Sequence, residues 1–72
     1  MAGAEAVRFL DRFLATLDDA RRAVFVMADI EQVSAPEISV ALAVKVNTVY
    51  SRLRSARAAF QDAVSAHQRG QP

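Results

Sequence analysis

The sequence has no cysteine, little glycine or proline, and no long apolar run. Without cysteine, disulfides and cysteine-ligated zinc sites are excluded. Two glycines and two prolines in 72 residues leave little material for the turns of an all-β fold, so helices are favoured. The longest uninterrupted apolar run covers only residues 23–28, whereas a membrane span needs about 18 residues. The N-terminus also lacks the basic and apolar segments of a signal peptide, so we expect a cytoplasmic protein without a membrane segment.

Acidic residues are missing from one long stretch, residues 38–61. Residues 1–37 hold four arginines against seven acidic residues, whereas residues 38–72 hold five basic residues against Asp62 alone. A basic half of this kind suits a polyanionic partner. Chance is the alternative, because 17 charges in a short chain can divide this unevenly without a functional reason.

Apolar spacing and capping residues predict one compact all-α domain of four helices over residues 1–72. A first helix, over about residues 5–16, is indicated by apolar residues at helical spacing. A second helix is predicted over about residues 19–29, because it starts at the aspartates at 18 and 19, which are good N-caps. Ser34 and Glu37 form a capping box that predicts a third helix over about residues 35–43. The residues that we expect on the inner faces of the first and third helices are Val7, Leu10, Leu14 and Leu17, and Ile38, Ala41 and Leu42.

The fourth helix is predicted over about residues 46–67, with an inner stripe of Val49, Leu53, Ala56 and Phe60. Residues 43–45 connect it to the third helix, and this pair has the layout of a helix-turn-helix, whose second helix enters the DNA major groove. At about 100° per residue, a polar set falls opposite the stripe or on its shoulders. The candidates for reading bases are Asn47, Tyr50, Ser51, Arg54 and Ser55. The candidates for contacting phosphates are Lys45, Thr48, Arg52 and Arg57, of which Arg52 is equally suited to packing within the domain.

Residues 17–60 resemble region 4 of bacterial sigma factors, and most closely the extracytoplasmic-function class. The resemblance rests on an acid–apolar–acid segment that leads to a serine, on a short helix with Glu37-Ile38, and on the start of the fourth helix. The two longer matching segments read Asp29-Ile30-Glu31-Gln32-Val33-Ser34 and Val46-Asn47-Thr48-Val49-Tyr50-Ser51-Arg52-Leu53-Arg54-Ser55-Ala56-Arg57.

The resemblance implies a domain that recognises the upstream promoter element in double-stranded DNA and docks on the β flap of RNA polymerase during transcription initiation. It also implies that an anti-sigma protein can cover the domain. Three positions depart from the family pattern. Ala43 stands where the family often has glycine, so this turn must close differently or bear slight strain. Asn47 and Tyr50 replace residues at the reading end of the helix, which leaves the preferred promoter sequence open.

Two other functions fit the same sequence. One is a helical protein-interaction module with weak or no DNA binding, and the other is the helix-turn-helix of a different regulator, such as a response regulator. An excised fragment and a separate small protein both remain open, because the other sigma domain is missing from this chain. We expect no enzyme activity and no catalytic, metal or cofactor site or small-molecule substrate. Asp18 and Asp19 are best explained by capping, the serines lack a histidine-based relay, and His67 stands alone.

Overall fold

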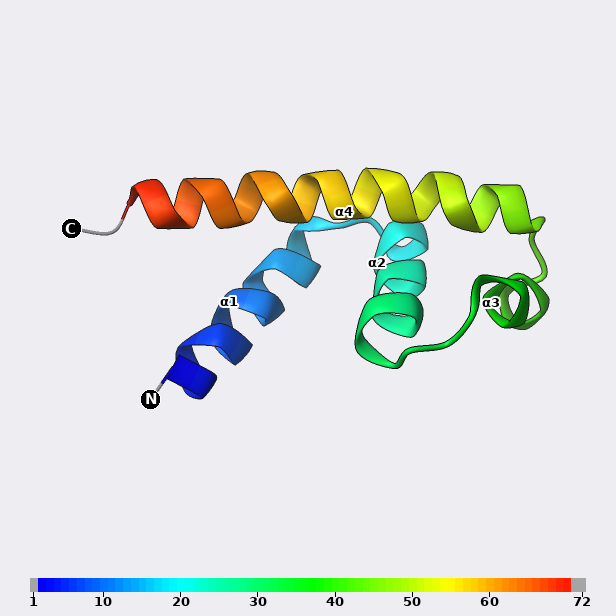
Figure 1. Ribbon diagram of the computed structural model, residues 1–72, viewed down its shortest axis with the longest axis horizontal. Helices are drawn as coiled ribbons and strands as arrows, with labels where there is room; N and C mark the ends of the chain where they lie inside the picture. Colours follow the sequence, from blue (N-terminus) through cyan, green and yellow to red (C-terminus); the bar gives the residue numbers. More distant parts are fainter. Residues whose placement is uncertain (1, 71–72) are drawn as a thin grey trace.

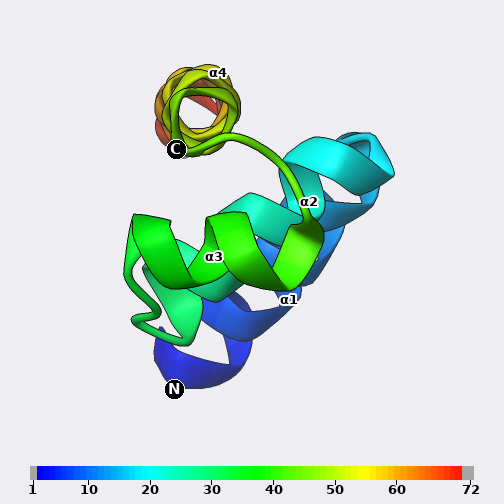
Figure 2. The same ribbon diagram turned by 90° about the vertical axis from the view of Figure 1, so that its right-hand side faces the viewer.

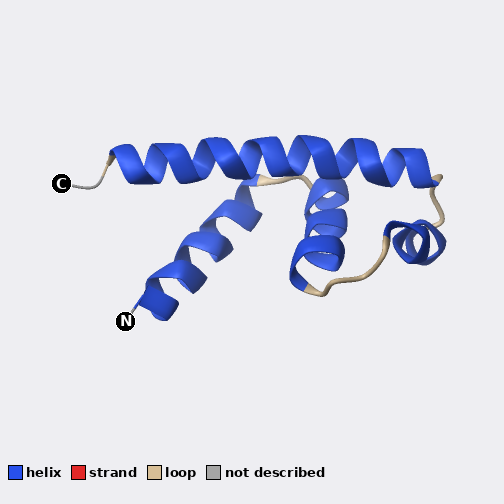
Figure 3. Ribbon diagram, in the orientation of Figure 1, coloured by secondary structure: helices blue, strands red, loops and turns tan. Residues whose placement is uncertain are grey.

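The structure is a computed structural model that describes residues 2–70. These residues form four α-helices and one π-helical turn, with no strand among them (Figure 3). The helices are α1 (Ala2–Thr16), α2 (Asp19–Phe25), α3 (Ala35–Leu42) and α4 (Val46–Arg69), and the π-helix η1 (Val26–Ile30) continues α2. The all-α prediction is confirmed. The first helix begins earlier than expected, the third ends one residue earlier, and the fourth continues two residues further.

Side chains at two predicted caps set where α2 and α3 begin. The Asp18 carboxylate accepts the backbone N–H of Arg21 at 2.9 Å, and the Ser34 hydroxyl accepts that of Glu37 at 3.3 Å. Each bond satisfies an amide that has no partner within its own helix. The second half of the capping box differs from the expectation. The Ser34 hydroxyl donates to the Glu37 carboxylate at 2.8 Å, a side-chain contact in place of one to the Ser34 amide.

The second helix does not stay regular to residue 29 as predicted. Its last turn widens into η1, where the backbone N–H of Glu31 donates to Val26 O at 2.9 Å, five residues back. Gln32 then takes a left-handed conformation with φ of 61°, and Val33 N–H closes back onto Met27 O at 2.8 Å. The wide turn ends the helix and brings Asp29 within reach of α4.

The core consists of two apolar clusters that α2 and α4 share. The first cluster joins α1 to α2 and the middle of α4, and its buried members are Phe13, Leu17, Phe25 and Ala56. The second joins α2 to α3 and the first half of α4, and its buried members are Val24, Ile38, Val49 and Leu53. Phe60, half-buried, packs on the first cluster, so the predicted inner stripe of α4 is confirmed.

Two predictions of side-chain burial are wrong, those for Val7 and Ala41. Val7 is 59% exposed because α1 diverges from α4 toward its N-terminus (Figure 1), so the first turns of α1 have little to pack against. Ala41 is exposed because Ile38 and Leu42 face the core from α3. His67 is exposed, and its ring lies 4.9 Å from that of Phe9.

The helices α1, α2 and α3 all lie on one side of α4 (Figure 2). α4 runs the length of the molecule, α2 crosses it, and α3 lies near its N-terminal half (Figure 1). The opposite side of α4 therefore carries none of these helices. No helix among residues 2–70 combines the length and the apolar character needed to cross a lipid bilayer.

Candidate nucleic-acid interface

The turn between α3 and α4 closes around a left-handed alanine. Ala43 has φ of 56° and ψ of 45°, a conformation that usually falls to glycine. Ala43 N–H donates to Val40 O at 3.2 Å and Val44 N–H donates to Ser39 O at 3.1 Å, the two bonds of a Schellman motif. The Ser39 hydroxyl donates to the carbonyl of Val44. The turn therefore keeps the glycine-type geometry and bears the strain of a β-carbon there.

The base-reading candidates lie on the uncovered side of α4 or at its edge, where Ser55 accepts a hydrogen bond from Arg21 of α2. All five are exposed, and Tyr50 is 51% exposed. Val49, Leu53 and Ala56, on the opposite side, are buried. The exposed side therefore presents an amide, hydroxyls and a guanidinium, which can donate to base edges in a major groove. The set comprises Asn47, Tyr50, Ser51, Arg54 and Ser55.

Three of the four phosphate candidates lie along one side of this face. Lys45 is the N-cap residue of α4 and is exposed, while Thr48 and Arg52 are half-buried. Among the described residues, neither Lys45 nor Arg52 has an ion-pair partner. The positive charge of Lys45 is therefore available to an outside anion. The pKa of the Asp18 carboxyl is lowered by the backbone hydrogen bond from Arg21 and also, from a distance, by the charge of Arg52.

The fourth candidate, Arg57, is held by Asp29. Its Nε and Nη2 donate to the two carboxylate oxygens at 2.8 and 2.6 Å. Hydrogen bonding from Arg57 lowers the pKa of Asp29, and the same bond raises the pKa of Arg57. This two-point contact fastens η1 to α4 on the side away from Arg52. Contact between Arg57 and a phosphate therefore competes with Asp29.

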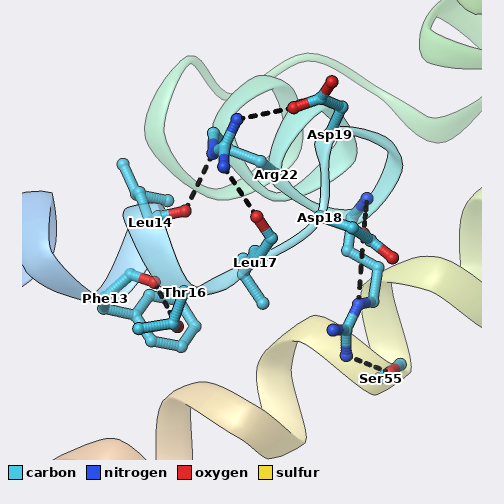
Figure 4. Close-up of polar contacts among 9 residues, drawn as sticks. Phe13, Leu14, Thr16, Leu17, Asp18, Asp19, Arg22 and Ser55 are labelled. Carbon is cyan, nitrogen blue, oxygen red and sulfur yellow. Dashed lines mark hydrogen bonds and ion pairs between the residues drawn. The ribbon is translucent and has the colours of Figure 1, made fainter.

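Two arginines of α2 have contacts that the sequence analysis missed. Arg22 Nε and Nη2 donate to the carbonyls of Leu14 and Leu17 at 2.8 and 2.6 Å, while Nη1 pairs with Asp19 at 2.9 Å (Figure 4). Arg22 thereby satisfies the carbonyls where α1 ends. Arg21 reaches Ser55 of α4 instead, at 3.1 Å. The sequence offers only a local signal for either contact, since an Asp lies three residues before each arginine.

A groove opens on the other flank, between α1, η1 and α4. It consists of two adjoining hollows of about 470 and 440 Å³ that share Leu10 and Phe60. Side chains that line it include Phe9, Val64 and Ile30, so most of its wall is apolar. It lies beside the C-terminal half of α4, beyond the base-reading candidates, although Arg57 lines its second hollow. Among residues 2–70, no group of three His, Cys, Asp or Glu side chains is arranged to hold a metal ion.

Comparison with known proteins identifies the family. No curated protein and no solved structure gives a significant match. A family model described as Sigma-70, region 4 matches residues 10–60, which include η1, α3 and the N-terminal part of α4 with the base-reading candidates. This match spans well over half of the chain, and the protein therefore belongs to the sigma-70 region 4 family.

Proposed function

We propose that the protein binds promoter DNA by placing the N-terminal half of α4 in the major groove during transcription initiation. The observation that carries this proposal is the uncovered side of α4, where Asn47, Ser51 and Arg54 are exposed and Lys45 and Arg52 flank them. No acidic residue occurs between residues 38 and 61, so no carboxylate of this segment repels the phosphates. Membership of the family supports the same role, which is one of binding and not of catalysis.

Within this role, three finer points belong to the proposal. The chain is a domain of the extracytoplasmic-function class, it acts in the cytoplasm, and residues 1–72 form a single domain. The match of residues 46–57 to the class pattern supports the first point. The cluster of aromatic rings that ties α1 to α4 supports the third, because Phe13 lies 5.4 Å from Phe25 and 5.1 Å from Phe60.

We further propose that the groove between α1, η1 and α4 is the surface that docks on the β flap of RNA polymerase. Its apolar floor suits the apolar face of a partner helix. Its lining includes none of the base-reading candidates, so DNA and polymerase can be held together. An anti-sigma protein that covers this groove would compete with the polymerase. The same groove favours the alternative of a protein-interaction module.

DNA titrations at several salt concentrations distinguish the two functions. Each phosphate that the protein neutralises contributes about −0.9 to the slope of log affinity against log salt. We expect weak binding for this chain alone, because only a few basic side chains are available to phosphates, and a steep slope, because Lys45 and Arg52 are among them. A slope near zero would contradict promoter binding and favour the protein-interaction module.

The docking proposal has its own test. Val64→Glu places a charge in the groove and should abolish binding to an isolated β flap, while DNA affinity stays unchanged. Ala58→Glu is a control of the same charge on the uncovered side of α4, and it should weaken DNA binding but leave the flap affinity unchanged. Equal flap affinity for the two variants would place the docking surface elsewhere.

A further inference from the structure

The N-terminal end of α2 places an arginine beside the outer face of α4. Arg21 Nη1 donates to Ser55 Oγ at 3.1 Å, and Arg21 Nε donates to the Asp18 carboxylate at 3.3 Å. Asp18 and Ser55, at the two ends of this chain of contacts, are labelled in Figure 4. The Arg21 side chain remains 33% exposed. A cation from outside the helix-turn-helix thus lies next to a base-reading candidate.

The Arg21 guanidinium has hydrogen-bonding capacity left. It carries five N–H donors, of which the contacts with Asp18 and Ser55 use two. The other three have no acceptor within residues 2–70. A guanidinium stays charged at every working pH, and its planar fork of donors matches phosphate oxygens. Arg21 can therefore bind a phosphate without releasing Ser55.

Arg21 also extends the line of cations on this side of α4. Lys45 and Arg52 lie on the same side of the helix as Ser55, at about 100° per residue. In the end-on view the turn before α4 and the N-terminal end of α2 lie to the same side (Figure 2). Three cations would then follow one DNA strand, whereas on the other side Arg57 is occupied by Asp29.

One carboxylate opposes this arrangement. Asp18 pairs with Arg21, whereas its neighbour Asp19 pairs with Arg22 at 2.9 Å and is almost fully exposed. The two aspartates carry the same charge, but only Asp18 shares a cation with the outer face of α4. A phosphate that approaches Arg21 must therefore displace the Asp18 side chain or meet its repulsion.

We propose that Arg21 is a further contact to the DNA backbone and that Asp18 is its internal competitor. DNA binding exchanges the Arg21–Asp18 contact for an Arg21–phosphate contact, while Ser55 keeps the guanidinium in place. The proposal rests on the proposed function of α4 and adds a contact made by a different helix. It predicts that the affinity for DNA is set below its maximum by a residue of the protein itself.

The first test compares Arg21→Gln with Arg8→Gln, in an anisotropy titration against labelled double-stranded DNA of arbitrary sequence. Arg8 is exposed on α1, so both variants remove the same charge. Because Arg21→Gln removes one bond to a phosphate, its salt slope should shrink by about 0.9 and its affinity at about 0.15 M salt should fall about fivefold. Arg8→Gln should change neither quantity. Equal behaviour of the two variants would overturn the proposal.

The second test asks for a gain in affinity. Asp18→Asn keeps a good N-cap, so the fold should be retained, but it removes the competing charge. We expect tighter DNA binding for Asp18→Asn, a smaller gain for Asp19→Asn, and only a small gain, through Arg52, for Asp18→Asn in an Arg21→Gln background. A gain that is undiminished without Arg21, or one equal in Asp19→Asn, would show a general charge effect and overturn the proposal. If the unaltered chain binds no DNA, the proposed function fails as well; if it binds, only this inference is at stake.

Discussion

At the scale of single residues, the molecule holds one alanine in a conformation that alanine disfavours. Ala43 makes the sharp turn that lets α4 leave α3, and its β-carbon costs roughly 1–2 kcal/mol in the left-handed region. The cost is borne because Val44, the next residue, packs into the second core cluster and both hydrogen bonds of the turn are made. The strain thus lies in the turn that sets the orientation of α4 relative to α3.

Ala43→Gly should stabilise the protein by about 0.5–1 kcal/mol. Glycine relieves the strain of the folded state, but it also raises the conformational entropy of the unfolded chain, which offsets part of the stabilisation. The matched control is Ala41→Gly, at an exposed position within α3, which should destabilise by about 0.5–1 kcal/mol. Urea denaturation of the two variants measures both effects. A decrease in stability for Ala43→Gly would mean that the turn does not hold a left-handed residue.

Also at this scale, Arg54 and Lys45 should have different effects on DNA specificity. A guanidinium donates two bonds to guanine O6 and N7, which is worth roughly 1–3 kcal/mol of discrimination. Lys45, at the helix start, suits phosphates, which carry no sequence information. Arg54→Ala should relax base preference at one position, whereas Lys45→Ala should weaken binding to all sequences alike. A binding competition of both variants against a library of altered promoter elements measures base preference. If Lys45→Ala changes the preference and Arg54→Ala does not, the two assigned roles are wrong.

At the scale of elements, α4 belongs to both core clusters and presents its opposite side to solvent. Its buried residues fall at the spacing of one helical stripe, and its exposed polar residues fall opposite. Core packing therefore fixes which residues can meet DNA. A substitution on the buried side should affect stability and not the DNA contacts, and a substitution on the exposed side should do the reverse.

Leu53→Ala and Arg54→Ala, at adjacent positions, separate these two tasks. Leu53 is 4% exposed, and truncating a buried leucine costs about 2–5 kcal/mol. Arg54 is exposed, so its removal should change the free energy of unfolding by no more than about 0.5 kcal/mol. Denaturant unfolding of both variants provides the comparison. Equal destabilisation would mean that the two sides of α4 are assigned wrongly.

The contact between η1 and α4 should give the protein an acid-sensitive component of stability. Because the pKa of Asp29 is lowered in the folded state, the ionised carboxylate stabilises the fold. This contribution is complete above the ordinary aspartate value of 3.8 and disappears as pH falls through the lowered value. It should be about 1 kcal/mol or less, because both partners are partly exposed.

The matching experiment follows the urea midpoint of the unaltered protein and of Asp29→Asn from neutral pH to about pH 3. The difference between the two should be constant near neutrality and should shrink in the acid range. A difference that does not depend on pH would show that Asp29 contributes by packing and not by charge.

At the scale of the whole molecule, the sequence was sufficient for the number of helices, the caps and the core stripe of α4. These features follow from short-range sequence patterns, such as the capping serine at 34 and the apolar spacing from Val49 to Phe60. The contacts of Arg21 with Ser55 and of Arg57 with Asp29 join residues far apart in the chain. They depend on how α2 crosses α4, which no local pattern specifies. The exposure of Val7 was missed for the same reason, because it follows from the angle at which α1 leaves α4.

The molecule measures 43 × 21 × 16 Å, and one helix accounts for most of the long dimension. The 24 residues of α4 rise about 36 Å, close to one turn of B-DNA. Because this helix is unbroken, its two halves cannot rotate independently. A partner that binds the C-terminal half of α4 therefore fixes the orientation of its N-terminal half. Distance and orientation between two bound macromolecules would thus be transmitted by a rigid rod, without any hinge along its length.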